Sequence, residues 1–367
     1  MTRSVAILLH ADEYLGEGAA QGLAIKQRGY VWCAFTPAQA ATLQADVEHL
    51  HSVGMTHIEY LDANEVAYRF GWLGKRVIGA KYDPTAGWLD SNALVHRYVS
   101  EINAPASQIL MGVESVKIRV ENGQVRGVET PGGLIAAPKV VIAAGAYARA
   151  IARTAGIELP IVIRPRMSVT TGWRHAEYPE QGPMLIGSAP FPHVRPEAGS
   201  GAIFGWEYTW QSRQWGKQYG TNQQHDALRE PVDRIDQLKD ARFPSLTLAL
   251  MARQFGHQEG EGFGDSRYLR GMHHNIGYYV SRDSSVAYRV DEQGEPHGYD
   301  SERAIMDAVP GIDGLFVSVA HVGHGIMSSP AAGEIIACKV LGLPLPNPLF
   351  ADFGFDVPWV EHDENAL

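Results

Sequence analysis

Residues 314–334 read GLFVSVAHVGHGIMSSPAAGE and are the most informative part of the chain. A β-type run, Leu315 to Val319, breaks into a turn with glycines at 323 and 325, and an apolar helix restarts at Ile335 to Leu341. Such a turn places bare backbone amides at a helix N-terminus, where they can cradle an anion or a cofactor. An ordinary strand-to-helix turn fits the same residues, so both interpretations stay open at this point.

A second segment favours the cofactor interpretation. Residues 140–148 read VVIAAGAYA, and LPIVIRPR follows at 159–166 after the apolar-patterned Ile151 to Ala155. Together with the C-terminal turn, this segment resembles the D-amino-acid-oxidase-like family of flavoproteins, which includes sarcosine oxidases, glycine oxidases and D-amino-acid dehydrogenases. The resemblance continues in family order through residues 27–31, 79–90 and 125–130, so it covers nearly the whole chain.

The resemblance implies a mixed α/β (α+β) fold. In it, a Rossmann-like FAD/NAD(P)-binding domain is interleaved with an antiparallel-sheet substrate domain. We expect FAD-binding segments at 105–160 and 305–345, a substrate domain at 161–304, mostly substrate-domain and connecting elements at 1–104, and a tail at 346–367.

One family feature is missing from the sequence. Members of the family open with a strand, a Gly-x-Gly-x-x-Gly turn and a helix, because the FAD pyrophosphate sits on the N-terminus of that helix. Here Thr2 to Ala6 resembles the piece that normally follows this unit. We therefore expect a βαβ unit of roughly 30 residues or a little more to be absent upstream of Met1, which leaves the FAD-binding domain N-terminally incomplete.

An alternative assignment would restore the unit. Val5 to Leu9 could be a strand, Gly16 to Gly22 a glycine loop and Val31 to Phe35 the second strand. It fits less well, because the glycines start several residues after the strand and no acidic residue closes the second strand. The assignment that accounts for more residues makes Gly29 to Phe35 a substrate-domain strand, followed by a helix at Pro37 to Val53.

Charge and cysteine usage limit the partners and the compartment. With 31 basic and 41 acidic residues the formal net charge is -10, which argues against a surface for nucleic acid or anionic membrane. The sequence has no apolar run near the roughly 20 residues of a membrane helix, and residues 1–10 lack the regions of a signal peptide. Cys33 and Cys338 indicate buried thiols in a reducing compartment, so we expect a cytoplasmic protein without a disulfide.

Local patterns predict individual elements. Apolar periodicity predicts helices, a turn signal at Glu121-Asn122-Gly123 predicts a hairpin, and a continuous apolar run predicts a fully buried parallel strand. The predicted elements are helices at 37–51, 91–102 and 226–242, hairpin strands at 115–120 and 124–129, the buried strand at 140–143, and substrate-domain strands at 184–186 and 202–208.

The resemblance also implies the residues that touch FAD. Val113 falls where the family backbone contacts the adenine; this concerns only its main chain, because its side chain fits better as a core valine at the start of a strand. The small residues Ala143, Ala144 and Gly145 fall on a turn that passes close to the ADP part. Gly323, His324, Gly325, Ile326 and Met327 fall on the turn whose amides face the flavin, with Ala320 where many relatives have glycine. Arg3 and Ser4 complete the implied set.

Candidate substrate groups come from Tyr268 to Arg282 and from Phe191 to Tyr208, and a further candidate, Arg166, lies beside the predicted strand Pro160 to Arg164. Tyr278 falls where sarcosine-oxidase-like members place a tyrosine and glycine-oxidase-like members a carboxylate-binding arginine; a sheet aromatic is the alternative. Arg166 could pair with a substrate carboxylate or form a surface salt bridge. His274 and Arg282 complete the substrate set, and Tyr278 and His324 are the candidate catalytic residues.

A metal site is not expected. His273 and His274 are adjacent, so on a strand they point to opposite faces and cannot ligate one ion. The motifs His-Glu-x-x-His, Cys-x-x-Cys and Gly-x-Ser-x-Gly do not occur in the sequence, which leaves zinc and serine hydrolases without support.

The resemblance therefore predicts an FAD-dependent oxidoreductase that oxidises the C–N bond of a small amine or amino acid by hydride transfer to the flavin. Where sarcosine-oxidase-like relatives carry a lysine after the Gly-His-Gly turn, this sequence has Met327, which favours a dehydrogenase over an oxidase. The alternative is a non-catalytic or truncated flavoprotein-like subunit that needs a partner, in a homo- or hetero-oligomer, to bind the cofactor.

Overall fold

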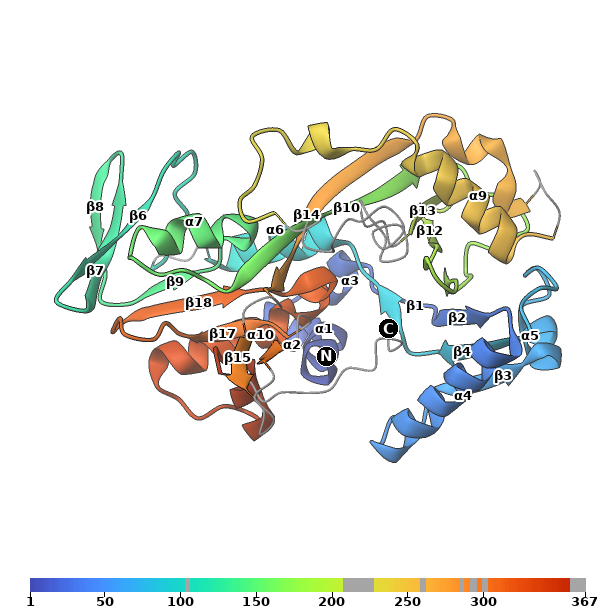
Figure 1. Cartoon of the computed structure of the whole chain (residues 1–367), viewed down its shortest axis with the longest axis horizontal. Helices are drawn as coiled ribbons and strands as arrows, with labels where there is room; N and C mark the ends of the chain where they lie inside the picture. Colours follow the sequence, from blue (N-terminus) through green and yellow to red (C-terminus); the bar gives the residue numbers. More distant parts are fainter. Residues whose placement is uncertain are drawn as a thin grey trace.

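The computed structural model describes residues 1–102, 106–206, 228–257, 262–283, 287–290, 296–298 and 303–356. In Figure 1 these residues form two groups of sheets joined by one long strand pair. The end of the predicted strand at 202–208 and the end of the predicted tail at 346–367 lie outside the described residues.

The largest sheet has eight strands in the order β14-β10-β13-β12-β11-β2-β4-β3. Its neighbours are antiparallel, except that β11 runs parallel to β2. The strands are β2 (Tyr30–Ala34), β3 (Glu59–Asp62), β4 (Gly79–Asp83), β10 (Ile161–Thr171), β11 (Met184–Ile186), β12 (His193–Glu197), β13 (Gly201–Gly205) and β14 (His273–Arg282).

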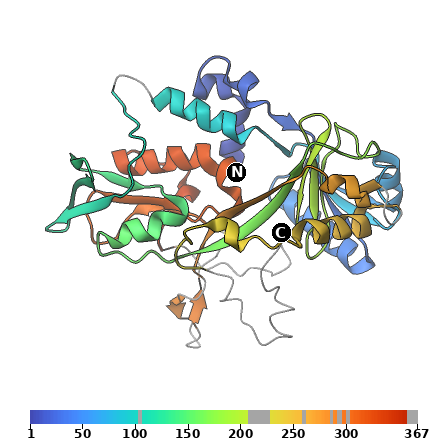
Figure 2. The same ribbon diagram turned by 90° about the horizontal axis from the view of Figure 1, so that it is seen from above.

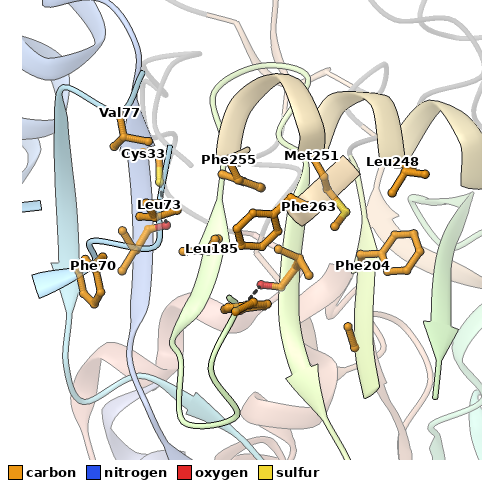
Figure 3. Packing of buried hydrophobic residues seen from close by; sticks show 14 of the residues in the cluster. Cys33, Phe70, Leu73, Val77, Leu185, Phe204, Leu248, Met251, Phe255 and Phe263 are labelled. Atoms are coloured by element: carbon orange, nitrogen blue, oxygen red, sulfur yellow. Dashed lines mark hydrogen bonds between the residues drawn. The ribbon is translucent and has the colours of Figure 1, made fainter. Parts of the chain in front are cut away.

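Helices cover this sheet, and their starts follow from local side-chain chemistry. Helix α4 (Pro37–Ser52) begins after Thr36, whose side chain accepts from the amide of Gln39, and α5 (Ala63–Arg69) begins with a capping box formed by Asp62 and Glu65. Helix α9 (Phe243–Phe255) lays its apolar side chains on the sheet. Figure 3 shows Met251 and Phe255 facing side chains such as Leu185 and Phe204 in the largest core cluster.

The long strand pair β10–β14 connects the two groups of sheets. It is antiparallel over ten residue pairs, from Ile161 opposite Arg282 to Thr170 opposite His273. Met167 and Val169 belong to the core under the eight-stranded sheet, whereas Ile161 and Ile163 belong to a second core. This strand pair therefore fixes the position of the eight-stranded sheet relative to the second core.

The second core surrounds a three-stranded sheet in the order β17-β18-β9. Strand β18 (Leu315–Val319) pairs parallel with β9 (Val140–Ile142) and antiparallel with β17 (Ile305–Ala308). Helix α10 (Gly325–Leu341) covers one face and α7 (Ala148–Arg153) the other (Figure 2). The carboxyl ends of the two parallel strands thus lie together, at the edge where open α/β sheets bind ligands.

A helical lobe lies on the side of α10 that faces away from the three-stranded sheet (Figure 2). It has its own small core, which includes Leu8, Leu15, Leu23 and Leu94. Its helices are α1 (Thr2–Leu9), α2 (Ala11–Leu15), α3 (Ala19–Leu23) and α6 (Ser91–Ile102).

The remaining elements are short or peripheral. A meander of three antiparallel strands, β6 (Lys117–Glu121), β7 (Gln124–Thr130) and β8 (Gly133–Ala136), forms a separate sheet. Two strand pairs are β1 (Lys26–Gln27) with β5 (Gly87–Trp88), and β15 (Ala287–Val290) with β16 (Pro296–Gly298). Short 3-10 turns are η1 (Gly145–Tyr147), η3 (Ile235–Leu238), η4 (Gly262–Gly264), η5 (Ser266–Leu269), η6 (Val322–His324) and η7 (Pro348–Phe353). None of the helices in the described part of the chain combines the length and apolar character that a membrane crossing requires.

Several predicted elements are confirmed with little or no change in their bounds. The strand at 315–319 is β18, the strand at 184–186 is β11 and the helix at 91–102 is α6. The helix at 37–51 is α4 with one further residue, and the hairpin forms as β6 and β7.

The predicted helix at 226–242 is wrong, whereas the predicted parallel strand at 140–143 is confirmed as β9 and only its full burial is wrong. In the described part of the predicted helix 226–242, Leu228 exchanges two backbone hydrogen bonds with Ile163 of β10, and only the 3-10 turn Ile235–Leu238 is helical. Pro231, which lacks an amide donor, lies between them. Strand β9 is not fully buried, because among the described strands only β18 pairs with it, and Val141 is 39% exposed.

The alternative glycine loop is also wrong. Val5 to Leu9 lie in helix α1, the glycines at 16 and 18 separate the short helices α2 and α3, and β2 is an inner strand of the eight-stranded sheet. The substrate-sheet assignment of Gly29 to Phe35 is the one the structure supports.

Candidate functional site

A pocket of about 380 Å³ opens where the carboxyl ends of β9 and β18 meet helix α10. Small side chains line its strand ends: Ala143 and Gly145 follow β9, and Gly145 has a φ of +52°, a backbone conformation that favours glycine. The lining is completed by Val141, Tyr278, Val280, Ser318, Val319, Ala320, His321, Val322, Gly325, Ser329, Ala332, Gly333 and Ile336. The structure therefore brings the two predicted cofactor turns to one cavity.

The turn between β18 and α10 is strained. Ala320, which replaces the glycine of many relatives, is buried and adopts a left-handed φ of +63°, and Val322 has a φ of +52°. A β-branched residue in this region is an outlier. Helix α10 begins at Gly325, ten residues before its predicted start at Ile335, so Ile326, Met327 and the exposed amides lie in its first turn.

Helix α10 continues through Pro330 because hydroxyl groups replace the missing hydrogen bonds. Proline has no amide to donate to Ile326, and the hydroxyl of Ser329 donates to that carbonyl at 2.8 Å instead. The amide of Ala331 donates to the hydroxyl of Ser4, which donates in turn to the carbonyl of Ser328, each at 3.1 Å. Ser4 is thus a buried link between α1 and α10.

Arg3, the neighbour of Ser4, forms a two-pronged ion pair with Glu334 of α10. Its Nε lies 2.8 Å from Oε2 and its NH2 2.7 Å from Oε1. The pair lowers the pKa of Glu334. Both predicted cofactor residues of the N-terminus therefore contact α10, the helix that lines the pocket.

His321 lies in the same turn and was missed by the sequence analysis. Its Nε2 is 3.1 Å from the hydroxyl of Ser318, and its Nδ1 is 3.5 Å from the hydroxyl of Ser328. Burial lowers the pKa of this imidazole. The sequence alone could not predict these contacts. They form only because the end of β18, with Ser318, and the start of α10, with Ser328, lie on either side of His321 in the folded chain.

The structure brings Tyr279 and Gly323 close to Arg166, one of the predicted substrate residues. The guanidinium of Arg166 lies 5.7 Å from the centre of the Tyr279 ring. A β-carbon added to Gly323 would lie 2.7 to 3.1 Å from the same ring, so the turn approaches this tyrosine closely. Glycine is also opposite Arg166 in the sheet, at Gly277, which leaves room beside it.

Tyr278 and Tyr279 are neighbours on β14 and so point to opposite faces of the sheet. Tyr278 lines the pocket, and its hydroxyl accepts a hydrogen bond from the amide of Val232 at 3.0 Å. Tyr279, which the sequence analysis did not name, contacts the turn from the Arg166 side. The pairing register that distinguishes them is a property of the folded sheet.

Besides Arg166, two predicted substrate residues lie outside the pocket lining. Arg282 is fully buried and donates to the carbonyls of Arg303 at 2.5 Å, Ala304 at 2.9 Å and Gly354 at 2.6 Å. His274 stacks on Phe243 of α9 with ring centres 5.5 Å apart, and burial is the main cause of its lowered pKa.

The other predicted residues have plain locations. Val113 is exposed in an extended segment before β6, and Ala144 precedes the turn η1 at the end of β9. His324 caps α10, and its amide donates to the carbonyl of His321 at 3.1 Å. Within the described ranges no group of three or more His, Cys, Asp and Glu side chains could hold a metal ion.

Solved structures of similar fold cover almost the whole chain. The L-proline dehydrogenase of P. horikoshii is 19% identical, covers 96% of this chain and 80% of its own, and superposes with a TM-score of 0.70. The glycine oxidase of Geobacillus kaustophilus is 18% identical, covers 97% and 81%, and gives 0.71. At this level of identity the likeness concerns the fold.

Sequence comparison with curated proteins finds shorter matches. A glycine oxidase of Pseudomonas putida is 29% identical over 132 residues, which are 30% of this chain and 36% of that protein. The sarcosine oxidase subunit beta of an Arthrobacter species is 30% identical over 95 residues, or 26% and 24%. The matched part thus spans about a third or less of these relatives.

A family profile matches far more of the sequence. Residues 3–339 fit the family described as FAD dependent oxidoreductase, a range that includes both cofactor turns, the pocket and the long strand pair. The chain belongs to this family of FAD-dependent oxidoreductases.

Proposed function

We propose that the chain is the catalytic part of an FAD-dependent oxidoreductase that oxidises the C–N bond of a small amine or amino acid. The observation that carries the proposal is the meeting of the β18–α10 turn with Arg166. Gly323 of that turn packs against the Tyr279 ring, and the guanidinium of Arg166 lies over the same ring. A cofactor-type turn and a carboxylate-binding group are therefore neighbours.

Residues of the pocket wall fit FAD. Ala143 and Gly145 are small enough to let the cofactor's ADP part approach the backbone, and the first turn of α10 supplies amides that favour negative charge at the flavin. We propose that segments 105–160 and 305–345 form one cofactor unit, which the pairing of β9 with β18 supports. When bound, FAD would supply the electron acceptor for hydride removal from the substrate carbon.

The protein's own contribution is binding and orientation. Arg166 would hold the substrate carboxylate, because a guanidinium matches its two oxygens. Tyr279 keeps that guanidinium at the turn. Tyr278 and His324 are the candidate catalytic residues, one in the pocket wall and one at the start of α10. No strong acid or base is needed if the amine binds in its neutral form.

The test is a substrate panel with the flavin-loaded protein. Glycine, sarcosine, proline and iminodiacetate represent the substrates named in the relatives, and their amine analogues without a carboxylate are the controls. Reduction of a dye by at least one member of the panel, with a preference for the carboxylates, supports the proposal. A loaded protein that reduces no dye with any member contradicts it.

We expect Arg166→Met to raise KM for the carboxylate substrate by roughly tenfold to 100-fold, because a hydrogen bond to a charged group contributes about 1.5–3 kcal/mol. The effect on kcat should be smaller, and Arg166→Lys should lie between, since lysine keeps the charge without the planar fork. Steady-state dye reduction measures both parameters. The matched control is Arg69→Met. Arg69 lies on helix α5 and forms a surface ion pair with Glu59 of β3. An unchanged KM in Arg166→Met would assign the carboxylate to another group.

We also propose that the enzyme is a dehydrogenase. Met327 is 41% exposed in the first turn of α10, and its thioether offers no positive charge to promote the reaction of reduced flavin with oxygen. We expect slow reoxidation in air-saturated buffer and an acceleration of about tenfold in Met327→Lys, the size of a 1.4 kcal/mol effect. Stopped-flow absorbance measures it, with Met327→Gln as the uncharged control. Rapid wild-type reoxidation that Met327→Lys does not improve would refute the assignment.

A second candidate function is a subunit that needs a partner unit for cofactor binding. Three observations favour it: the outer edge of β9 has no partner among the described strands, Val141 on it is exposed, and Val95, Val99 and Ile102 form an exposed apolar stripe along α6. A homo- or hetero-oligomer could cover these surfaces. Dye reduction with an excess of added FAD decides, because activity of the chain alone supports the enzyme and activity only after a partner is added supports the subunit.

We further propose a reducing, cytoplasmic compartment. Both cysteines are free, and burial raises the pKa of the Cys33 thiol, which keeps it protonated and unreactive. Thiol titration of the denatured protein from unreduced cell extract should find two thiols; a mixed disulfide would argue for another compartment.

A further inference from the structure

The strained backbone of the turn between β18 and α10 requires stabilising contacts. Ala320 and Val322 both have left-handed backbones, at φ +63° and +52°. Each such residue costs on the order of 1–3 kcal/mol and persists only where its surroundings fix it. His321 lies between them, and each of its two ring nitrogens contacts the hydroxyl of a serine.

We propose that His321 is the positioning residue of the cofactor-facing turn, holding strand β18 and helix α10 together through a neutral imidazole that carries its proton on Nδ1. The inference rests on the proposed function only in taking the turn to face the cofactor. The contacts of His321 with Ser318 and Ser328, called the clamp below, do not depend on a bound cofactor. His321 acts through the shape of the turn and is not placed in contact with a substrate.

The geometry spans the two elements that the turn joins. Ser318 belongs to β18 and lies 3.1 Å from Nε2, and Ser328 belongs to α10 and lies 3.5 Å from Nδ1. The carbonyl of His321 also accepts a hydrogen bond from the amide of His324 at 3.1 Å. The residue thus ties the strand, the turn and the first helical turn into one unit, whereas a leucine of similar size would leave two hydroxyls without their partner.

The hydrogen-bond pattern selects one tautomer. The hydroxyl of Ser328 donates to the carbonyl of Gly325 at 3.3 Å, so its single proton is used and it can only accept from Nδ1–H. Nε2 then accepts from the hydroxyl of Ser318. A neutral ring, with one donor and one acceptor nitrogen, satisfies both contacts.

The surroundings favour the neutral ring. Tyr278 of β14 lines the same pocket as His321, the hydroxyl of Ser4 on α1 donates to the carbonyl of Ser328, and the charges of Arg3 and Glu334 are paired with each other. Tyr98 of α6 bonds Ser329, and His324 follows in the turn. Burial is the cause of the lowered pKa of His321.

A pH dependence follows with a definite sign. The folded pKa lies below the unfolded value of about 6.5, so the unfolded state binds the proton more readily. The stabilisation of the turn is therefore fully present above about pH 6.5 and is lost as the pH falls through the folded pKa.

The test is amide hydrogen exchange of residues 320–327, measured by mass spectrometry on the full chain without FAD. We expect protection factors in the wild type to fall about tenfold between pH 7.5 and pH 5. His321→Leu should lose about tenfold at pH 7.5. His321→Gln, whose amide can donate and accept without titrating, should keep the protection and lose its pH dependence. Residues 335–341 of α10 report whether the fold is intact.

The controls separate the clamp from general effects. His51→Gln removes another histidine, an exposed one whose Nε2 contacts the carbonyl of Ile58, and it should leave residues 320–327 unchanged. Full protection in His321→Leu, an unaltered pH dependence in His321→Gln, or an equal effect of His51→Gln would each overturn the proposal. An FAD titration of the same variants tests the proposed function separately, because the exchange results stand even if flavin binds to none of them.

Discussion

Replacing Arg282 with methionine is expected to lower the free energy of unfolding by roughly 3–5 kcal/mol. The side chain is fully buried and donates to the carbonyls of Arg303, Ala304 and Gly354. Methionine fills a similar volume but removes all three hydrogen bonds, and each buried group that is left unsatisfied costs about 1–3 kcal/mol. Urea denaturation followed by circular dichroism measures the change.

A control variant and a KM measurement distinguish the structural role of Arg282 from the predicted substrate-binding role. Arg119→Met removes an arginine that forms two ion pairs on the exposed meander, with Glu121 and Glu129, and should cost less than about 1 kcal/mol. If Arg282→Met keeps the wild-type stability and instead raises KM, the substrate-binding role expected from the sequence is correct. A large loss of stability identifies Arg282 as the link between the end of β14, the start of β17 and the turn η7.

The sequence predicted best those elements whose cause is local. Strand β18 and helix α6 have the predicted bounds because an apolar run with clear turn signals, or a regular apolar periodicity, lies within the segment itself. The predicted helix at 226–242 failed because Leu228 pairs with Ile163, a contact between residues far apart in sequence. Helix α10 continues through Pro330 for a similar reason, since Ser4 from the N-terminus satisfies the amide of Ala331.

The candidate site shows the same division. Glycines 145, 323 and 325 mark turns, and a turn can be predicted from its residues, so their places at or beside the pocket were foreseeable. Which of two adjacent tyrosines faces the β18–α10 turn from the Arg166 side depends on the pairing of β14 with β10. His321 likewise gains its role from Ser318 and Ser328, which only the folded turn brings to its two nitrogens.

The chain is expected to bind FAD no more than about threefold more tightly than riboflavin, with dissociation constants of roughly 10 μM or weaker. The β18–α10 turn can contact the flavin, and the pocket beside it has room for part of the cofactor. Among the described residues no strand is followed by a Gly-x-Gly-x-x-Gly turn and a helix for the pyrophosphate: Gly16 and Gly18 separate short helices of the lobe, and Gly323 and Gly325 belong to the β18–α10 turn. A net charge of -10 adds no attraction for two phosphates.

Isothermal titration with FAD, FMN and riboflavin isolates the contribution of each part of the cofactor. Near-equal affinities show that the chain holds the flavin ring and little else. Supplying a separate strand-turn-helix unit with a Gly-x-Gly-x-x-Gly turn should then raise the affinity for FAD by at least 100-fold and leave riboflavin almost unchanged, since only FAD carries the pyrophosphate that such a turn binds. Sub-micromolar FAD binding by the chain alone, with a strong preference over riboflavin, would mean that other residues hold the pyrophosphate. In that case Arg3 is the first to substitute, because its guanidinium lies beside the pocket helix and is paired with Glu334.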